Sequence, residues 1–207
     1  MTNPTEPCSP TIIENRMVEE VSYKHDTFID GRETNTNRAV VVKNSVFYSC
    51  RLFDCYFGNW TFEDVVFSEC RFDIVDFDKV KLKNVRFQGC DFHEFRTCQT
   101  SFVNTEGIDY FPDAPARLLQ VAQHIINNPT SLDMGTWSDC NACGTRKCIA
   151  GWGIHFAGAA GEYLVDRYNY EMAGLILLGP EAHEHFYSSD KEAVEYLEQV
   201  LRKETLR

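Results

Sequence analysis

The chain has 207 residues, of which 43% are hydrophobic and 25% are charged, a composition typical of one or two folded domains and not of a disordered chain. Its formal net charge of −11 disfavours direct binding to nucleic acid or to anionic lipid, because phosphate groups would repel it. The sequence contains no run of about 18 apolar residues, the length that a membrane-spanning helix requires. The first residues also lack the basic and apolar regions of a secretory signal, so we expect a cytoplasmic protein of a bacterium or of a phage-infected bacterium.

The charge is unevenly distributed along the chain. Residues 40–104 carry 9 acidic and 8 basic side chains, whereas residues 105–207 carry 15 acidic and 8 basic ones. The chain also holds nine cysteines, and in a reducing compartment these serve packing or metal binding more often than disulfides. The sequence therefore predicts a near-neutral middle segment followed by an acidic C-terminal half.

We interpret residues 1–39 as an N-terminal extension that caps the segment following it. A large apolar residue then recurs at every fifth position from Phe47 to Phe102, with Thr97 as the one exception. A second series, mostly small or β-branched, lies two residues before each of these, from Ser45 to Thr100. Neither the helical period of 3.6 nor the strand period of 2 produces this pattern.

The period and composition of residues 45–104 resemble the pentapeptide-repeat family, as in Val65-Val66-Phe67-Ser68-Glu69 and Cys70-Arg71-Phe72-Asp73-Ile74. The resemblance implies a right-handed quadrilateral β-helix in which four repeats form one coil. The central Phe or Leu and the small residue two places earlier would fill its interior. Twelve repeats then give about three coils, and we place the β-helix at residues 40–104.

Residues twenty apart stack on one another in such a helix, which makes individual positions predictable. Cys50, Cys70 and Cys90 would form one inward column, with packing the favoured role and redox or metal chemistry the alternative. We expect an apolar partner-binding surface on the outside, with Val46, Tyr48 and Val66 on one face and Phe53 and Ile74 round the corner. Cover by the N-terminal extension is the other explanation for these side chains.

The stretch from Thr105 to Ala114, rich in turn-forming residues, is predicted to be a linker. From residue 115 to residue 207 the pattern becomes helical, so the overall class is α+β, a short β-helix followed by a compact acidic α-helical domain. We expect a helix that is N-capped by Asp113 and ends before Pro129, and a second helix from Cys148 to Ala157. A buried segment should follow from Gly174 to Leu178. The last helix should begin with a capping box from Ser189 to Glu192.

The stretch Cys143-Gly144-Thr145-Arg146-Lys147-Cys148-Ile149-Ala150-Gly151-Trp152 resembles a signature of uncharacterised small proteins of bacteria and their phages. Cys140, Cys143, Cys148 and His155 supply four ligands of the kind that tetrahedral zinc takes. A helix starting at Cys148 would, however, hold His155 roughly 10 Å away at 1.5 Å per residue. Packing of these cysteines is the favoured interpretation, with structural zinc and a redox-sensitive Cys143/Cys148 pair as alternatives.

No common catalytic motif occurs in the sequence, which argues against an enzyme. The first hypothesis is a non-enzymatic protein-binding module without a cofactor. Such a module could act as a phage or bacterial accessory factor that modulates a host protein, for instance in counter-defence. Its partner would be another protein or a second copy of the chain. Some pentapeptide-repeat proteins mimic DNA and inhibit gyrase, so an acidic DNA mimic is an alternative, and a zinc-stabilised structural domain is another.

Overall fold

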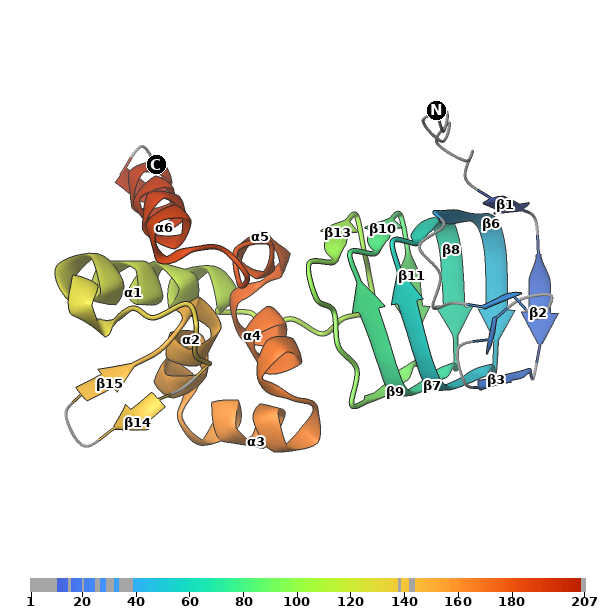
Figure 1. Ribbon diagram of the computed structural model, residues 1–207, viewed down its shortest axis with the longest axis horizontal. Coiled ribbons are helices and arrows are strands. Elements are labelled where there is room, and N and C mark those ends of the chain that lie inside the picture. Colours follow the sequence, from blue (N-terminus) through green and yellow to red (C-terminus); the bar gives the residue numbers. More distant parts are fainter. Residues whose placement is uncertain are drawn as a thin grey trace, which may run out of the picture. The chain divides into compact units, whose positions relative to one another are not determined.

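The computed structural model describes residues 11–14, 16–19, 21–24, 27–28, 32–33, 39–137, 139–141 and 144–205. The chain divides into two compact units, Met1–Gly107 and Ile108–Arg207 (Figure 1). The first unit is built from β-strands and the second mainly from helices, which agrees with the predicted fold class.

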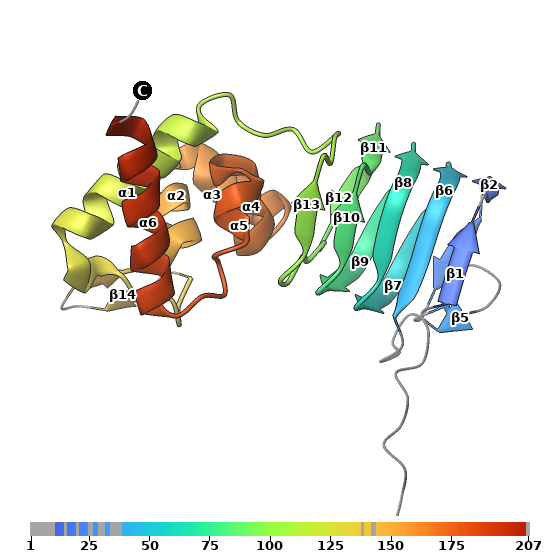
Figure 2. The same cartoon turned by 90° about the horizontal axis from the view of Figure 1, so that it is seen from above.

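The first unit is a parallel β-helix of about three turns, as predicted. Its long strands are β6 (Val40–Tyr48), β7 (Arg51–Gly58), β8 (Thr61–Ser68) and β9 (Arg71–Asp78). Shorter strands complete the later turns: β10 (Lys81–Lys83), β11 (Arg86–Gln88), β12 (Asp91–His93) and β13 (Ser101–Val103). Each strand pairs in parallel with residues 20 positions away, so strands of successive coils lie side by side (Figure 2).

A left-handed backbone residue turns each corner of the coil. Positive φ angles recur at every fifth residue from Asn44 (φ 47°) to Asn104 (φ 51°). Four corners in each 20-residue coil separate four flat faces. We call them face 1 (residues 41–43, 61–63, 81–83 and 101–103), face 2 (46–48, 66–68 and 86–88), face 3 (51–53, 71–73 and 91–93) and face 4 (56–58, 76–78 and 96–98).

The repeated apolar residues form the core of this unit. Phe47, Phe67 and Phe87 stack with ring centroids 4.9 and 5.5 Å apart and with nearly parallel planes. The Phe72–Phe92 and Phe62–Phe77 pairs are also stacked. Between faces 2 and 3, Phe67 meets Phe72 and Phe87 meets Phe92 edge to face, a favoured geometry for aromatic pairs. The Phe that recurs every fifth residue therefore provides both the shape of the coil and most of its buried surface.

Three strands of the predicted N-terminal cap extend the β-helix by a further, partial coil. The strands β1 (Thr11–Glu14), β2 (Met17–Glu19) and β3 (Ser22–Lys24) pair in parallel with β6 and β7. Their partners lie 29 positions later instead of 20, which means that the chain between β3 and β6 holds nine extra residues. The antiparallel pair of β4 (Thr27–Phe28) and β5 (Arg32–Glu33) lies in this part of the chain.

One residue near each end of the coil stack makes a close contact that depends on its residue type. Phe28 is fully buried, and its ring lies 5.2 Å from that of Phe47, 5.1 Å from that of Phe57 and 5.8 Å from that of Trp60. At the other end Gly107 (φ 89°) follows the bridge between Arg86 and Glu106. A Cβ atom on Gly107 would lie 1.7 Å from the carbonyl oxygen of Phe87, so only glycine fits there.

The described residues of the second unit form six α-helices. They are α1 (Ala114–Asn127), α2 (Ile149–Ala157), α3 (Ala159–Arg167), α4 (Tyr170–Leu178), α5 (Pro180–His183) and α6 (Asp190–Thr205). A 3₁₀ turn, η1 (Pro129–Ser131), follows α1, and the strands β14 (Asp139–Asn141) and β15 (Gly144–Arg146) form an antiparallel pair. No helix among the described residues is long and apolar enough to cross a membrane.

The helix ends match the sequence prediction in most places. The capping box of α6 is present, because the Glu192 amide donates to Ser189 Oγ and the Ser189 amide donates to Glu192 Oε2. Asp113 occupies the predicted N-cap position of α1, but its side chain makes no capping hydrogen bond. Its carboxylate instead pairs with Arg117, 2.7 Å away and one turn along α1.

Candidate interaction surface

The residues predicted to form one binding surface occupy two separate regions of the β-helix. Val46 and Val66 lie side by side on face 2 as partners in the β6–β8 register, and Tyr48 is on the same face. Phe53 lies on face 3, where the guanidinium of Arg51 covers its ring at 5.4 Å. Ile74 stands at the corner between faces 3 and 4. The structure therefore groups the first three residues and sets the other two apart.

Face 2 carries a row of apolar side chains that crosses three coils. In this row Met17 pairs with Val46, and Val46 pairs with Val66. Met17 is 71% exposed, and the two valines are half-buried. Tyr48, 39% exposed, stands beside the row and donates its hydroxyl proton to Glu69 at 3.0 Å. We call Met17, Val46 and Val66 the apolar row.

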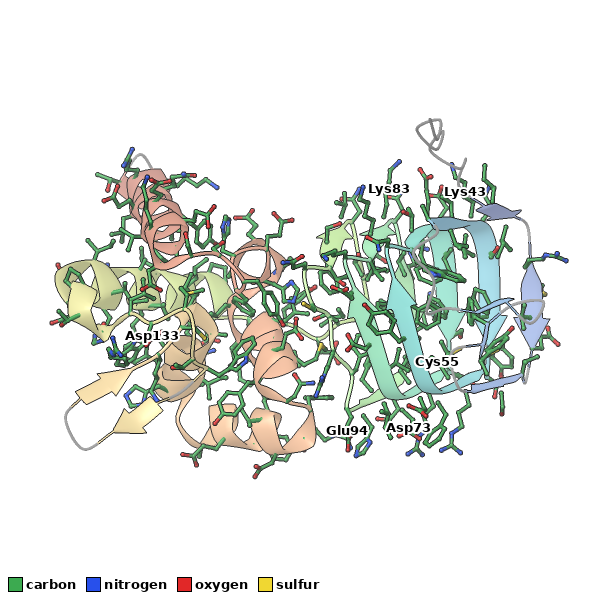
Figure 3. All side chains as sticks on the ribbon, in the orientation of Figure 1. Lys43, Cys55, Asp73, Lys83, Glu94 and Asp133 are labelled. Carbon is green, nitrogen blue, oxygen red and sulfur yellow. The ribbon has the colours of Figure 1, made fainter. Side chains whose placement is uncertain are left out.

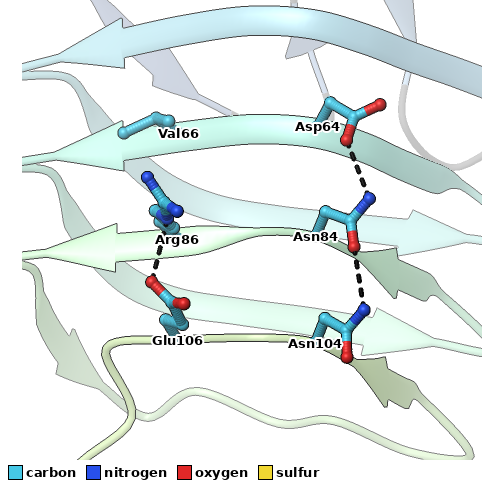
Figure 4. Close-up of a pocket in the computed structure, with 6 residues that line it drawn as sticks. All are labelled: Asp64, Val66, Asn84, Arg86, Asn104 and Glu106. Carbon is cyan, nitrogen blue, oxygen red and sulfur yellow. Dashed lines mark hydrogen bonds and ion pairs between the residues drawn. The ribbon is translucent and has the colours of Figure 1, made fainter.

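A groove of about 360 Å³ continues from the apolar row toward the last coil. Its lining consists of Asp64, Val66, Asn84, Arg86, Asn104 and Glu106 (Figure 4). Three of these form a ladder along one corner of the β-helix, since Asn104 Nδ2 donates to Asn84 Oδ1 at 3.1 Å and Asn84 Nδ2 donates to Asp64 Oδ1 at 2.8 Å. Arg86 and Glu106 form an ion pair at 2.9 Å on the groove floor.

Face 1 is occupied by charged groups that neutralise one another. Lys43 and Lys83 flank Glu63 from the coils on either side, with Lys43 Nζ 2.8 Å from Glu63 Oε2. These two lysines lower the pKa of Glu63 to about 2. The column of Lys43, Glu63 and Lys83 thus pairs charge with opposite charge.

Face 3 has a similar centre at Asp73, whose carboxylate is almost completely buried. Arg51 Nη2 lies 2.8 Å from Asp73 Oδ2, Arg71 Nε lies 3.1 Å from the same oxygen, and His93 Nδ1 lies 3.3 Å from Oδ1. Burial alone would raise the pKa of Asp73, but Arg51 and Arg71 outweigh it and lower the pKa below its ordinary value. Figure 3 shows Asp73 and Glu94 on the side of the β-helix opposite Lys43 and Lys83.

Cys50, Cys70 and Cys90 form the predicted column, and their thiols donate hydrogen bonds to backbone carbonyl oxygens. Cys70 Sγ donates to the carbonyl oxygen of Phe47 at 3.3 Å, and Cys90 Sγ donates to that of Phe67 at the same distance. A hydrogen bond with Cys50 lowers the pKa of the Cys70 thiol, but the hydrogen bond with Cys90 and burial raise it to about 11. Because the thiol and not the thiolate prevails at neutral pH, Cys70 is a packing residue and a weak nucleophile.

In the helical unit, the segment that resembles the phage signature is held by close backbone contacts. Cys148 is the N-cap of α2, and its sulfur accepts a hydrogen bond from the Gly151 amide at 3.3 Å. The Trp152 indole N–H donates to the carbonyl oxygen of Ser131 at 3.0 Å, and the Cys148 amide donates to that of Thr136. These contacts fasten residues 131–137 to the start of α2.

The zinc prediction stays a prediction. Cys143 lies outside the described residues, and for Cys140 only the backbone is described. Burial raises the pKa of the Cys148 thiol to about 11, and this sulfur already caps α2. His155 is exposed on the last turn of α2 and packs against the Trp152 ring. Within the part of the chain that the structure describes, no three His, Cys, Asp or Glu side chains gather as a metal site would require.

A buried polar contact in the helical unit was not predicted. His183 Nε2 lies 3.2 Å from Glu171 Oε1, and both side chains are buried between α4 and α5. The two residues are twelve positions apart and follow no motif. Only the presence of a charged residue at the start of the otherwise apolar α4 could have drawn attention to Glu171.

Comparison with known proteins supports the interpretation of the β-helix. A family model described as pentapeptide repeats, in 9 copies, matches residues 47–94. A solved structure of a pentapeptide repeat protein, Rfr23 from the cyanobacterium Cyanothece 51142, is similar at 11% identity with a TM-score of 0.25, covering 46% of this chain and 83% of that one. A search of curated proteins found no match. Residues 47–94 of the chain are therefore pentapeptide repeats.

Proposed function

We propose that the chain is a non-enzymatic protein-binding module, and that the apolar row and the adjoining groove form its contact surface. The observation that carries this proposal is the position of Met17, Val46 and Val66 in one column of three coils. On faces 1 and 3, the columns that contain Glu63 and Asp73 are instead made of ion pairs. Face 2 therefore offers apolar contact on a rigid surface.

The groove complements the apolar row. Its amide ladder and the Arg86–Glu106 pair place hydrogen-bonding groups beside Val66, as in the polar rim that surrounds the apolar centre of a protein interface. Pentapeptide-repeat proteins are generally structural or binding proteins, which agrees with this role. The resemblance of residues 143–152 to small proteins of bacteria and their phages favours a bacterial protein as the partner, whose activity this chain would modulate.

The proposal is tested with a double variant that changes only the surface. Val46→Lys with Val66→Lys places two charges on the apolar row, while the inward neighbours Ser45, Phe47, Val65 and Phe67 are unchanged. Val41→Lys is the matched control, because Val41 is a half-buried valine of β6 that points outward from face 1. Cross-linking in bacterial lysate, followed by mass spectrometry, should identify a partner with the parent and the control but not with the double variant. Recovery of the same proteins by all three would contradict the proposal.

Native mass spectrometry under reducing conditions separates the other possibilities. A dimer that dissociates in the double variant would show that a second copy of the chain occupies face 2. One zinc per chain, lost on mutation of Cys143 or Cys148, would support the zinc-stabilised alternative. The DNA-mimic alternative rests on the acidic residues 105–207, since residues 40–104 are nearly neutral. It requires inhibition of gyrase supercoiling by the purified protein.

A further inference from the structure

The corners of the β-helix impose a backbone conformation that most residue types avoid. The residues at these corners have φ between about 47° and 61°, the left-handed region in which glycine, asparagine and aspartate are best tolerated. Asn, Asp, Ser, Glu, Gln, Lys and Gly hold these positions from residue 44 to residue 104, except at Ile74 (φ 57°). A β-branched side chain is strained there, because its Cβ substituents crowd the backbone.

Burial in the β-helix does not compensate for this strain. Ile74 is 43% exposed, although its neighbours Asp73 and Val75 in the sequence are buried. A strained residue with an exposed apolar side chain costs stability without contributing to the core. Such outliers persist where the side chain serves a purpose outside the fold.

The two neighbours of Ile74 along its corner are acidic residues. In the register of β7 with β9, Phe53 pairs with Asp73 and Cys55 with Val75, which places Asp54 opposite Ile74 in the preceding coil. In the same way, Glu94 stands opposite Ile74 in the following coil, one residue beyond the His93–Asp73 pair. Adjacent strands are about 4.8 Å apart. Ile74 is therefore flanked along its corner by two carboxylates.

We propose that the Ile74 corner is a second contact site, which inserts its apolar side chain into a partner pocket bordered by Lys or Arg side chains. The cationic border follows from charge complementarity with Asp54 and Glu94. A second copy of the same corner is a disfavoured partner, because its own carboxylates would repel Asp54 and Glu94. The inference rests on the proposed protein-binding function. It is tested separately, because Ile74 and the apolar row lie in different regions of the β-helix.

The strain is measured first. Ile74→Asn places a residue suited to the left-handed region at the corner and should raise the melting temperature by about 2–4 °C, as relief of roughly 1 kcal/mol would. Lys79→Asn, at a neighbouring corner with φ 55°, is the control for a polar corner residue. Because lysine is not β-branched, we expect a smaller rise for it. An Ile74→Asn variant that is no more stable than the parent would overturn the premise.

The contact is measured with a random 12-residue peptide library displayed on phage. Peptides are selected on the full chain and depleted on Ile74→Asn. We expect the surviving peptides to carry a large apolar residue flanked by Lys or Arg. Their affinity should fall at least about tenfold on Ile74→Asn, since burial of one aliphatic side chain contributes about 1.5–3 kcal/mol. Asp54→Asn and Glu94→Gln should weaken binding less and reduce its salt dependence.

Two outcomes would overturn the proposal. One is a selection that yields no peptide after depletion, and the other is a set of peptides without basic residues whose binding Asp54→Asn and Glu94→Gln leave unchanged. The Val46→Lys, Val66→Lys double variant distinguishes the two surfaces. It should bind the selected peptides as the parent does, even if the contact proposed for face 2 is absent.

Discussion

The carbonyl oxygen of Trp137 lies 1.8 Å from the position that a Cβ atom on Gly151 would occupy. Gly151→Ala must therefore displace the backbone of the Trp137 segment from α2. We expect a loss of about 1–3 kcal/mol in the free energy of unfolding, despite the roughly 1 kcal/mol that alanine gains over glycine in a helix. Urea unfolding followed by circular dichroism measures it.

Gly135→Ala is the control for this substitution. A Cβ atom there would meet only the Asp133 carboxylate, at 3.2 Å, and a side chain can move aside. Equal stability of Gly151→Ala and the parent would show that residues 131–137 are not fastened to α2 as described.

Phe28 packs against Phe47, Phe57 and Trp60 in the interior of the β-helix, so its removal should expose these side chains. We expect Phe28→Ala to lower the free energy of unfolding by about 3–5 kcal/mol, the usual loss for a buried phenylalanine. The fluorescence of Trp60, whose ring contacts Phe28, should shift to longer wavelength. Phe28→Leu should lose much less, and a Phe28→Ala variant with parental stability would contradict this packing.

The amide ladder of the groove should contribute measurably to stability. Asn84→Ala removes one hydrogen bond to Asp64 and one from Asn104, together worth about 1–2 kcal/mol. Asn59→Ala is the matched control, because Asn59 has φ 59° and alanine costs the same at either corner. The difference between the two variants in thermal unfolding isolates the ladder. No difference would mean that water replaces both bonds without loss.

Glu63 should make the β-helix sensitive to acid. Its pKa is about 2 in the folded protein, below the ordinary 4.5, so its contribution to stability is complete above pH 4.5 and is lost as the pH falls toward 2. Glu63→Gln removes this contribution, and its melting temperature should fall less steeply with acid over that range. The difference should shrink in 1 M salt, which screens the lysines. Parallel pH profiles in low salt would contradict the lowered pKa.

The β-helix was predictable because one signal repeats every five residues. From Phe47 to Phe102 the large apolar residues are nearly uniform, and each occupies the predicted inward position. The partial coil at the N-terminal end follows the same period with Ile13, Val18, Tyr23 and Phe28. It escaped notice because its residue types vary and because nine extra residues shift it against the later repeats.

The helical unit was predicted less completely. The apolar stripe of α1 and the capping box of α6 are local signals, and both led to helices in the right place. The helix α4 begins with the Asn169 side chain accepting from the Met172 amide, a cap that the sequence analysis overlooked. The Glu171–His183 contact depends on how α4 and α5 pack, and no pattern of residues encodes it.

The constant 20-residue register gives the β-helix the properties of a ruler. Loss or duplication of 20 residues would change its length by one division of about 4.8 Å while every side chain stayed on its own face. An insertion of five, ten or fifteen residues that continues the repeat would move the following side chains to other faces, whereas the nine extra residues between β3 and β6 leave the facing strands in register. The distance between two contact points on this protein can therefore change in evolution only by whole divisions, and a partner that spans them must change its own spacing by the same step.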